Sequence, residues 1–316
     1  MNRQLQTRIV SVLLCILFSL LTWSTAWADF YVIAVGQRAK NTILVSPQST
    51  PSKSGDVLLS ALNKAADASA TNRYLILIEP GIFYLGNNSL AMKEYVDIQG
   101  SGKNVTIIKG SNSNNDGLIQ GADHAELRFL TLRNQNNGPR AVALYNNGTS
   151  PVITNVHIRA SGATRNYGIH NVSSASPEMN LVTVQVSGGE SNYGVLNNSS
   201  SSPIMNNVRI EARGGLRNYG VNNTKDCIPE ISNVHILATQ GGDFNIGVLN
   251  NNEAILRINR SFIRGADSAV LTGHGSTTYI GSSVLSGAAT VKGAGIHKCA
   301  ASYSYGYDLL NNQCIP

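Results

Sequence analysis

Residues 151–228 read PVITNVHIRASGATRNYGIHNVSSAS, PEMNLVTVQVSGGESNYGVLNNSSSS and PIMNNVRIEARGGLRNYGVNNTKDCI, which are three successive units of equal length that each begin with a proline. A fourth unit follows from Pro229, with one residue inserted before its Gly247, and an earlier unit begins at Ala125. A fixed period of 20–50 residues is typical of solenoid proteins, in which each repeat forms one coil. The repeats run from residue 125 to about residue 255.

Within each unit, apolar residues alternate with polar ones. His157 separates Val156 from Ile158, and the same alternation recurs in the units that follow. A period of two over a short run indicates a strand with one buried face, and no segment of the repeats has helical spacing. Each unit offers about three such strands, separated by Gly, Asn and Ser turns. We therefore predict an all-β fold, a parallel β-helix.

The pattern extends beyond the repeats in both directions. Similar strand runs give about nine coils of 22–26 residues between residues 73 and 290. Residues 29–72 form an N-terminal segment, in which residues 56–69 predict a helix with Asp56 as its N-cap. We expect this helix to cover the first coil, because an open β-helix end is a bare strand edge. Residues 291–316 form a C-terminal tail.

Cysteine use suggests one disulfide. Cys299 and Cys314 flank a Tyr-rich loop in the tail. In an oxidising compartment we expect them to pair and to stabilise the fold by about 3 kcal/mol. Cys227 is left over, either as an incidental free thiol or as an intermolecular link.

Residues 1–28 have the features of a secretory signal peptide. Arg3 and Arg8 precede an apolar run over residues 9–21, and Ala26-Trp27-Ala28 is an A-x-A cleavage motif. An N-terminal membrane anchor is the alternative. After cleavage the formal charge is 22 − 18 = +4, which is too small for a nucleic-acid-binding surface. No other segment is long and apolar enough to be predicted as a membrane span. The protein is therefore expected to be secreted or periplasmic.

Two segments near the N-terminus carry a family resemblance. Residues 74–84 (YLILIEPGIFY) and 95–102 (YVDIQGSG) are similar to the opening coils of pectin methylesterase-like proteins. The chain as a whole resembles the pectin lyase-like superfamily of right-handed parallel β-helices. The close resemblance covers residues 56–110, and the remainder matches only in coil architecture. It implies that the helix is right-handed.

The resemblance also implies an esterase site with two Asp, a Gln pair and an Arg. Arg140 stands where the first active-site Gln is expected, and residues 151–225 contain no Asp. Without a pair of carboxylates the site has no nucleophile and no acid or base. We therefore predict no catalytic residue. The Asp clusters that would hold calcium are also missing from the sequence, so no metal or other cofactor is predicted.

Columns of equivalent residues, one per coil, supply the candidate binding surface. Arg and His side chains can hydrogen-bond the hydroxyls and carboxylates of a polymer, and such residues recur at outward positions of the second strand. Tyr residues and Asn residues also recur once per repeat. Stacking of equivalent side chains that stabilises the fold would explain these columns, and so would a stripe of residues that binds sugar. The candidate binding residues are Arg133, His157, Arg159, Arg209, His235, Tyr167, Tyr193 and Tyr219.

Three functions are compatible with these features. The leading prediction is a secreted, non-catalytic β-helix that binds a polysaccharide or another cell-surface component along its side. A divergent pectin-active esterase or lyase is the first alternative, and a purely structural rod is the second. An ordinary solvated sheet face would equally explain the Arg and His columns, and fold alone does not choose between these functions.

Overall fold

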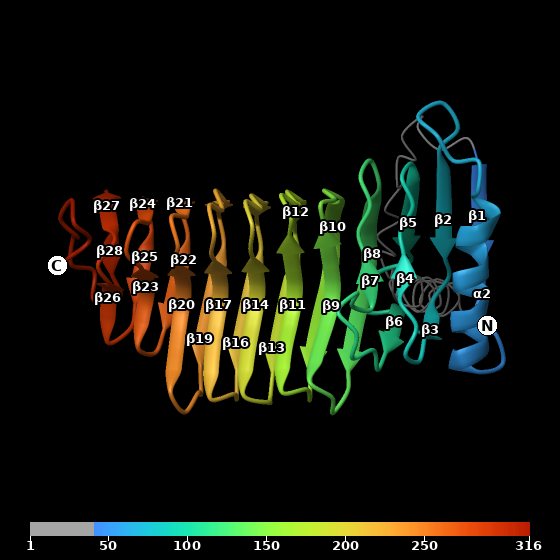
Figure 1. Ribbon diagram of the computed structural model, residues 1–316, viewed down its shortest axis with the longest axis horizontal. Coiled ribbons are helices and arrows are strands. Elements are labelled where there is room, and N and C mark those ends of the chain that lie inside the picture. The colour runs from blue at the N-terminus through green and yellow to red at the C-terminus, as the bar shows by residue number, and fades with distance from the viewer. Residues whose placement is uncertain (1–40) are drawn as a thin grey trace, which may run out of the picture. The chain divides into compact units, whose positions relative to one another are not determined.

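The computed structural model describes residues 41–316, which form a parallel β-solenoid with one α-helix near the start (Figure 1). Its strands belong to two sheets, of 19 and nine strands, and every pairing between named strands is parallel. Each coil contributes one strand to the smaller sheet, so eight complete turns separate its first strand from its last. The prediction of an all-β parallel solenoid with about nine coils is confirmed. The predicted signal peptide, residues 1–28, lies outside the described residues.

The nine-stranded sheet runs the length of the solenoid. Its strands are β4 (Leu90–Ala91), β7 (Ile119–Gln120), β9 (Arg140–Asn147), β11 (Arg165–Val172), β14 (Ser191–Asn197), β17 (Arg217–Asn223), β20 (Phe244–Asn250), β23 (Ser268–Thr272) and β26 (Ala289–Lys292).

The larger sheet contains two strand positions per coil. Strands at the first position are β1 (Asn41–Val45), β2 (Tyr74–Ile78), β5 (Val96–Gly100), β12 (Glu178–Asn180), β15 (Ile204–Asn206), β18 (Glu230–Ser232), β21 (Ile255–Asn259), β24 (Thr277–Gly281) and β27 (Ile296–Ala300). Strands at the second are β3 (Gly81–Tyr84), β6 (Thr106–Gly110), β13 (Thr183–Ser187), β16 (Arg209–Arg213), β19 (His235–Thr239), β22 (Phe262–Gly265), β25 (Val284–Ser286) and β28 (Tyr303–Ser304). Two long strands span both positions, β8 (Glu126–Gln135) and β10 (Val152–Ser161).

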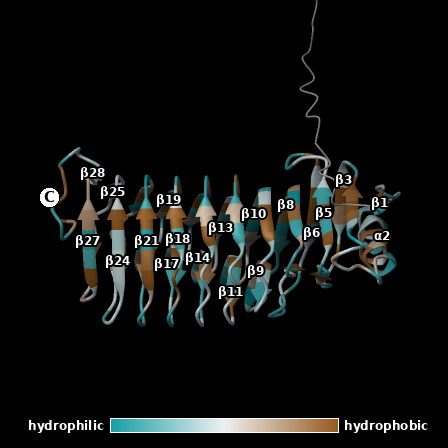
Figure 2. Ribbon diagram, turned by 90° about the horizontal axis from the view of Figure 1, so that it is seen from above, coloured by the Kyte–Doolittle hydropathy of each residue, from teal (hydrophilic) through white to brown (hydrophobic). Residues whose placement is uncertain are grey.

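A single residue in the left-handed region bends the chain between these two positions. Leu181, Asn207 and Asn233 have φ values of 56°, 54° and 55° at this bend in three successive coils. The alternation read from the sequence places its apolar residues inside, so that Val184, Ile210 and Ile236 are fully buried. Figure 2 shows the resulting brown and teal bands along the strands.

Two ladders of buried asparagine side chains run along the two ends of the strands in the nine-stranded sheet. In the first, each Nδ2 donates to the Oδ1 of the next coil at 2.7–2.8 Å, through Asn146, Asn171, Asn197 and Asn223. The second runs at 2.8–3.0 Å through Asn166, Asn192, Asn218 and Asn245. It ends on the Asp267 carboxylate, which accepts hydrogen bonds from the Asn245 backbone and side chain. These ladders satisfy polar groups that would otherwise be buried without partners.

A glycine column at the middle of the same strands lets neighbouring coils approach closely. A Cβ atom on Gly194 would lie 2.3 Å from the Cγ2 atom of Ile210 and 2.4 Å from the carbonyl oxygen of Gly220. Gly168 and Gly220 are equally confined. Any side chain here would therefore separate the strand from the core.

The N-terminal end is closed by helix α2 (Pro51–Lys64), which packs against β1 and β3 (Figure 1). The helix itself is confirmed, but its predicted start at Asp56 is wrong. Thr50 is the N-cap and accepts a hydrogen bond from the Lys53 backbone N–H at 3.3 Å, and Pro51 occupies the first turn. Gly55 lies inside the helix, where the helix packs closely against β3. A Cβ at this position would lie 2.1 Å from the carbonyl oxygen of Tyr84.

The C-terminal tail closes the other end. The predicted disulfide between Cys299 and Cys314 is present, and Leu310 is buried beside it. Cys299 donates its backbone N–H to Asn312, so the tail folds back over β27. Parallel pairing therefore continues past residue 290, as it also begins at β1, ahead of residue 73. Cys227 is fully buried, and burial raises the pKa of its thiol.

The asparagine ladders predict a large, position-specific loss of stability. Replacing Asn192→Ala removes two buried ladder hydrogen bonds, the one that Asn166 donates and the one that Asn218 accepts. We expect the free energy of unfolding to fall by about 2–4 kcal/mol, measured by urea denaturation. Asn206→Ala, an exposed strand residue, is the control and should cost less than about 0.5 kcal/mol. Equal losses in the two variants would contradict the role given to the ladder.

Candidate functional site: a column of unpaired cations

The predicted binding residues fall on two separate faces. Arg133, His157, Arg159, Arg209 and His235 lie on the 19-stranded sheet, whereas the three tyrosines lie on β11, β14 and β17 of the nine-stranded sheet. A ligand strip that includes all eight residues is therefore not formed. Each face is described separately below.

Three cations on consecutive coils form what we call the cation column: Lys109 of β6, Arg133 of β8 and Arg159 of β10. Lys109 is the register partner of Arg133, and Arg133 is the register partner of Arg159. All three are partly exposed, and none takes part in the four ion pairs found within residues 41–316. Neighbouring coils lie about 4.8 Å apart, so like charges here stand in close succession.

The column ends at a polar network. Its next two positions are Gln185 and Glu211, and Gln185 donates to the Glu211 carboxylate at 3.1 Å. Arg213 forms an ion pair with Glu211 at 3.2 Å, so this carboxylate already has a cation of its own. Among residues 41–316, the positive charge of the cation column is therefore not paired with an acidic side chain.

His157 lies beside the cation column, and the cations of the column contribute to lowering its pKa. Its Nε2 atom is 3.0 Å from Arg159 Nε and 2.9 Å from Gln185 Oε1. Burial lowers the pKa of His157, and the cations Arg159, Lys103 and Arg133 lower it further, against a hydrogen bond with Gln185 that raises it. Burial and then Arg133 lower the pKa of Arg159. Burial and the neighbouring cations together therefore disfavour protonation of His157.

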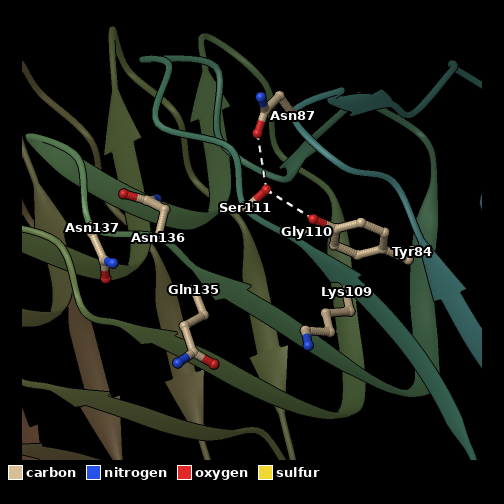
Figure 3. A pocket seen from close by; sticks show the side chains of 8 residues that line it. All are labelled: Tyr84, Asn87, Lys109, Gly110, Ser111, Gln135, Asn136 and Asn137. Atoms are coloured by element: carbon tan, nitrogen blue, oxygen red, sulfur yellow. Dashed lines mark hydrogen bonds between the residues drawn. The ribbon is translucent and has the colours of Figure 1, made fainter. Parts of the chain in front are cut away.

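A polar pocket of about 490 Å³ lies at the Lys109 end of the column (Figure 3). Its lining residues are Tyr84, Asn87, Lys109, Gly110, Ser111, Gln135, Asn136 and Asn137. Ser111 Oγ lies 2.9 Å from Asn87 Oδ1 and 3.1 Å from the Tyr84 hydroxyl. The Lys109 ammonium lies 5.9 Å from the centre of the Tyr84 ring. Amide, hydroxyl and ammonium groups therefore converge on one hollow.

Sequence reasoning found Arg133 and Arg159 but missed Lys103, Lys109 and the pocket. The coil that leads from Lys109 to its register partner Arg133 is shorter than the regular repeat. The repeat spacing, counted back from Arg133, leads instead to Ile107, which is an unrelated position. The strand run over residues 105–110 was the available signal.

Arg209 and His235 form a different group, two and three coils beyond His157. Arg209 Nη1 lies 3.3 Å from His235 Nδ1, and the His235 ring stacks on Phe262 at 4.8 Å. Burial and Arg209 lower the pKa of His235. These contacts occupy both side chains locally, and neither joins the cation column.

The tyrosines on the nine-stranded sheet stack on one another. The ring centres of Tyr167, Tyr193 and Tyr219 are 5.0 and 5.2 Å apart, with interplanar angles of 7° and 13°. Each inner ring face is therefore covered by the next ring, and Tyr167 is only 7% exposed. Sugars bind tyrosine through the ring face, so this arrangement favours the structural interpretation of the ladder.

His170 continues this stack. Its ring lies 5.2 Å from Tyr167 and 5.4 Å from Tyr145, measured between centres. Burial, reinforced by Arg140, lowers the pKa of His170 to about 4. The folded protein therefore holds this imidazole neutral at pH values where the unfolded chain protonates it.

Three carboxylates of the N-terminal coils, those of Asp97, Glu126 and Asp123, have structural partners. Asp97 accepts a hydrogen bond from the Glu126 backbone N–H at 2.9 Å and pairs with Arg73 at 3.4 Å. Glu126 itself pairs with Arg128. Asp123 accepts from the Ser150 backbone N–H at 2.7 Å. Within residues 41–316, no group of three or more His, Cys, Asp or Glu side chains is placed to hold a metal ion.

Comparison with solved structures adds the fold relatives. The chain is similar to pectate lyase Pel9A with a TM-score of 0.54 and 12% identity, over 84% of this chain and 78% of that one. The fold is that of a right-handed, pectin lyase-like β-helix. The predicted resemblance to this superfamily is thereby confirmed at the level of the fold.

Two weaker similarities complete the comparison. Pectin methylesterase PemA from Erwinia chrysanthemi matches with a TM-score of 0.45 and 12% identity, over 89% of this chain and 94% of that one. The GH87 α-1,3-glucanase of Streptomyces thermodiastaticus matches with a TM-score of 0.36 and 11% identity, over 87% and 65%. No family model and no curated protein matches the sequence. The described helix α2 is neither long nor apolar enough to cross a membrane.

The stacked imidazole predicts how stability depends on pH. Between about pH 6.5 and pH 4 the unfolded chain binds a proton at His170 that the folded chain does not, so stability should fall as the pH falls. The next coil has Leu196 at the equivalent position. His170→Leu should therefore reduce the fall in unfolding free energy between pH 7.5 and pH 4.5 by about 2–3 kcal/mol. Urea denaturation at pH 7.5 and pH 4.5 measures the difference, and an unchanged pH slope in the variant would contradict it.

Proposed function

We propose that this protein is a carbohydrate-binding β-helix whose cation column binds an acidic, carboxylate-bearing polysaccharide. The proposal rests on one observation: Lys109, Arg133 and Arg159 stand in register on three coils without an acidic partner among the described residues. An extended polymer parallel to the solenoid axis would meet one cation about every 4.8 Å. Repeated carboxylates on the polymer would neutralise that charge.

The chemistry of the side chains suits such a ligand. A guanidinium group binds a carboxylate through two parallel hydrogen bonds, and Lys109 adds a compact charge. The adjoining pocket offers amide and hydroxyl groups from Gln135, Ser111 and Tyr84, which suit the hydroxyls of one sugar unit. Partial burial of the cations strengthens these contacts relative to fully solvated charges.

We further propose that binding is not followed by catalysis. The cation column includes no carboxylate that could act as nucleophile, acid or base. Asp97 is held by Arg73 and by the Glu126 backbone N–H, and Glu126 is paired with Arg128. A secreted or periplasmic location completes the proposal, supported by the leader-like residues 1–28 and by the disulfide.

Charge removal tests this assignment. Arg133→Gln combined with Arg159→Gln should weaken binding to polygalacturonate at least tenfold, because two charge-assisted contacts are lost. Affinity electrophoresis and calorimetry with purified residues 29–316 measure the change. Wild-type binding should also weaken as salt is raised and be absent with a neutral polysaccharide.

Arg264→Gln is the matched control. Arg264 occupies the same position of its coil as Arg159, but its register neighbours are Leu237 and Ser286. The control should bind like wild type. Equal loss in both variants would indicate a net-charge effect and overturn the site, and chemical alteration of the polymer would overturn the non-catalytic part.

A further inference from the structure

A second hollow lies near the C-terminal end of the 19-stranded sheet, on β21, β24 and β27. It has a volume of about 350 Å³ and is lined by Arg257, Asn259, Tyr279, Ile280, Gly281, Lys298, Cys299 and Ala300. β24 is five coils beyond β10, so the hollow is roughly 24 Å along the axis from the cation column. It is therefore a separate site.

Two cations flank an aromatic ring at this hollow. Arg257, Tyr279 and Lys298 are register partners on three consecutive coils. The Arg257 guanidinium lies 6.0 Å and the Lys298 ammonium 5.6 Å from the centre of the Tyr279 ring. Cation–π contacts of this kind orient both positive groups around the ring. Tyr279 remains 39% exposed, so its edge and hydroxyl are accessible.

The hollow exists because side chains are missing from the neighbouring column. At this position the earlier coils carry Asn180, Asn206, Ser232 and Asn259. The last two coils carry only Gly281 and Ala300. The column beside Tyr279 therefore carries no side chain larger than a methyl group in its last two coils. The Asn259 amide lines the hollow, since its Oδ1 atom would lie 2.7 Å from a Cβ on Gly281.

The local charge is positive. Glu230 lies 3.9 Å from Arg257, but both side chains are about half exposed, so this pair contributes little. Lys298 has no acidic partner in the described part of the chain. An anionic group that enters the hollow would reach either the Lys298 ammonium or the Arg257 guanidinium, which flank the Tyr279 ring from the two neighbouring coils.

We propose that this hollow is a second binding site for a carboxylate-bearing sugar unit, which makes the protein bivalent for acidic polysaccharide. This inference rests on the proposed function of the cation column. Two sites at opposite ends of one rigid solenoid can hold two polymer chains, because a chain bound at one end does not fill the other. The protein would then cross-link the polymer rather than only coat it.

Two measurements test bivalency. The first is calorimetric titration with a galacturonate trimer, which is shorter than the distance between the sites. Wild type should bind two trimers per chain, whereas Tyr279→Ala with Lys298→Gln should bind one, as should Arg133→Gln with Arg159→Gln. The second is turbidity with long polygalacturonate, which should form with wild type and fall at least tenfold with either double variant.

The controls separate this inference from the proposed function. Arg264→Gln, which lies outside both sites, should retain two sites, and unchanged melting temperatures show that the variants fold. One trimer per wild-type chain, or two in the Tyr279→Ala/Lys298→Gln variant, would overturn the second site alone. No binding by wild type would overturn both proposals. Inorganic phosphate that occupies the hollow and is not displaced by the trimer would assign it to phosphate and overturn the sugar site.

Discussion

The hydrogen bonds between stacked asparagine side chains are the constraint on which this solenoid depends. Each coil turns sharply on both sides of the nine-stranded sheet, and those turns bury polar groups that water cannot reach. In the coils from β9 to β20, an amide that donates to one neighbouring coil and accepts from the other solves the problem. Because the bond length fixes one coil against the next, the ladders also fix the register of every strand between them.

Because the coils are in strict register, equivalent outward residues form columns along the solenoid, and these columns determine which side chains are neighbours on the surface. The tyrosine stack and the glycine column arise in this way on the nine-stranded sheet. Gly194 allows neighbouring coils to pack closely, and the Tyr193 ring stacks on that of Tyr167. On the other sheet, equal residues in successive coils concentrate charge. A single arginine on a strand is an ordinary surface residue, but Arg133 and Arg159 in register form a site.

The two candidate sites lie where the repeat becomes irregular. The regular coils between residues 177 and 255 fill their outer columns with short polar side chains and local partners, such as Gln185 with Glu211. Towards the N-terminus the coils shorten, and the pocket beside Lys109 opens. Towards the C-terminus Gly281 and Ala300 replace bulkier residues, and the hollow beside Tyr279 opens. Regular coils thus supply the scaffold, and departures from the repeat supply the concave surfaces.

The sequence by itself determined the parallel solenoid, its coil count, the stacking columns from residue 125 onward and the disulfide between Cys299 and Cys314. These features are periodic or local, so the constant spacing of the repeat is sufficient to find them. Only the tertiary structure explained the glycine inside α2, since the contact between Gly55 and Tyr84 joins segments of different coils. It also decided that Lys109 joins Arg133, that Arg209 does not, and that the tyrosines face elsewhere. Coils of unequal length bring distant residues together by packing, which no fixed spacing encodes.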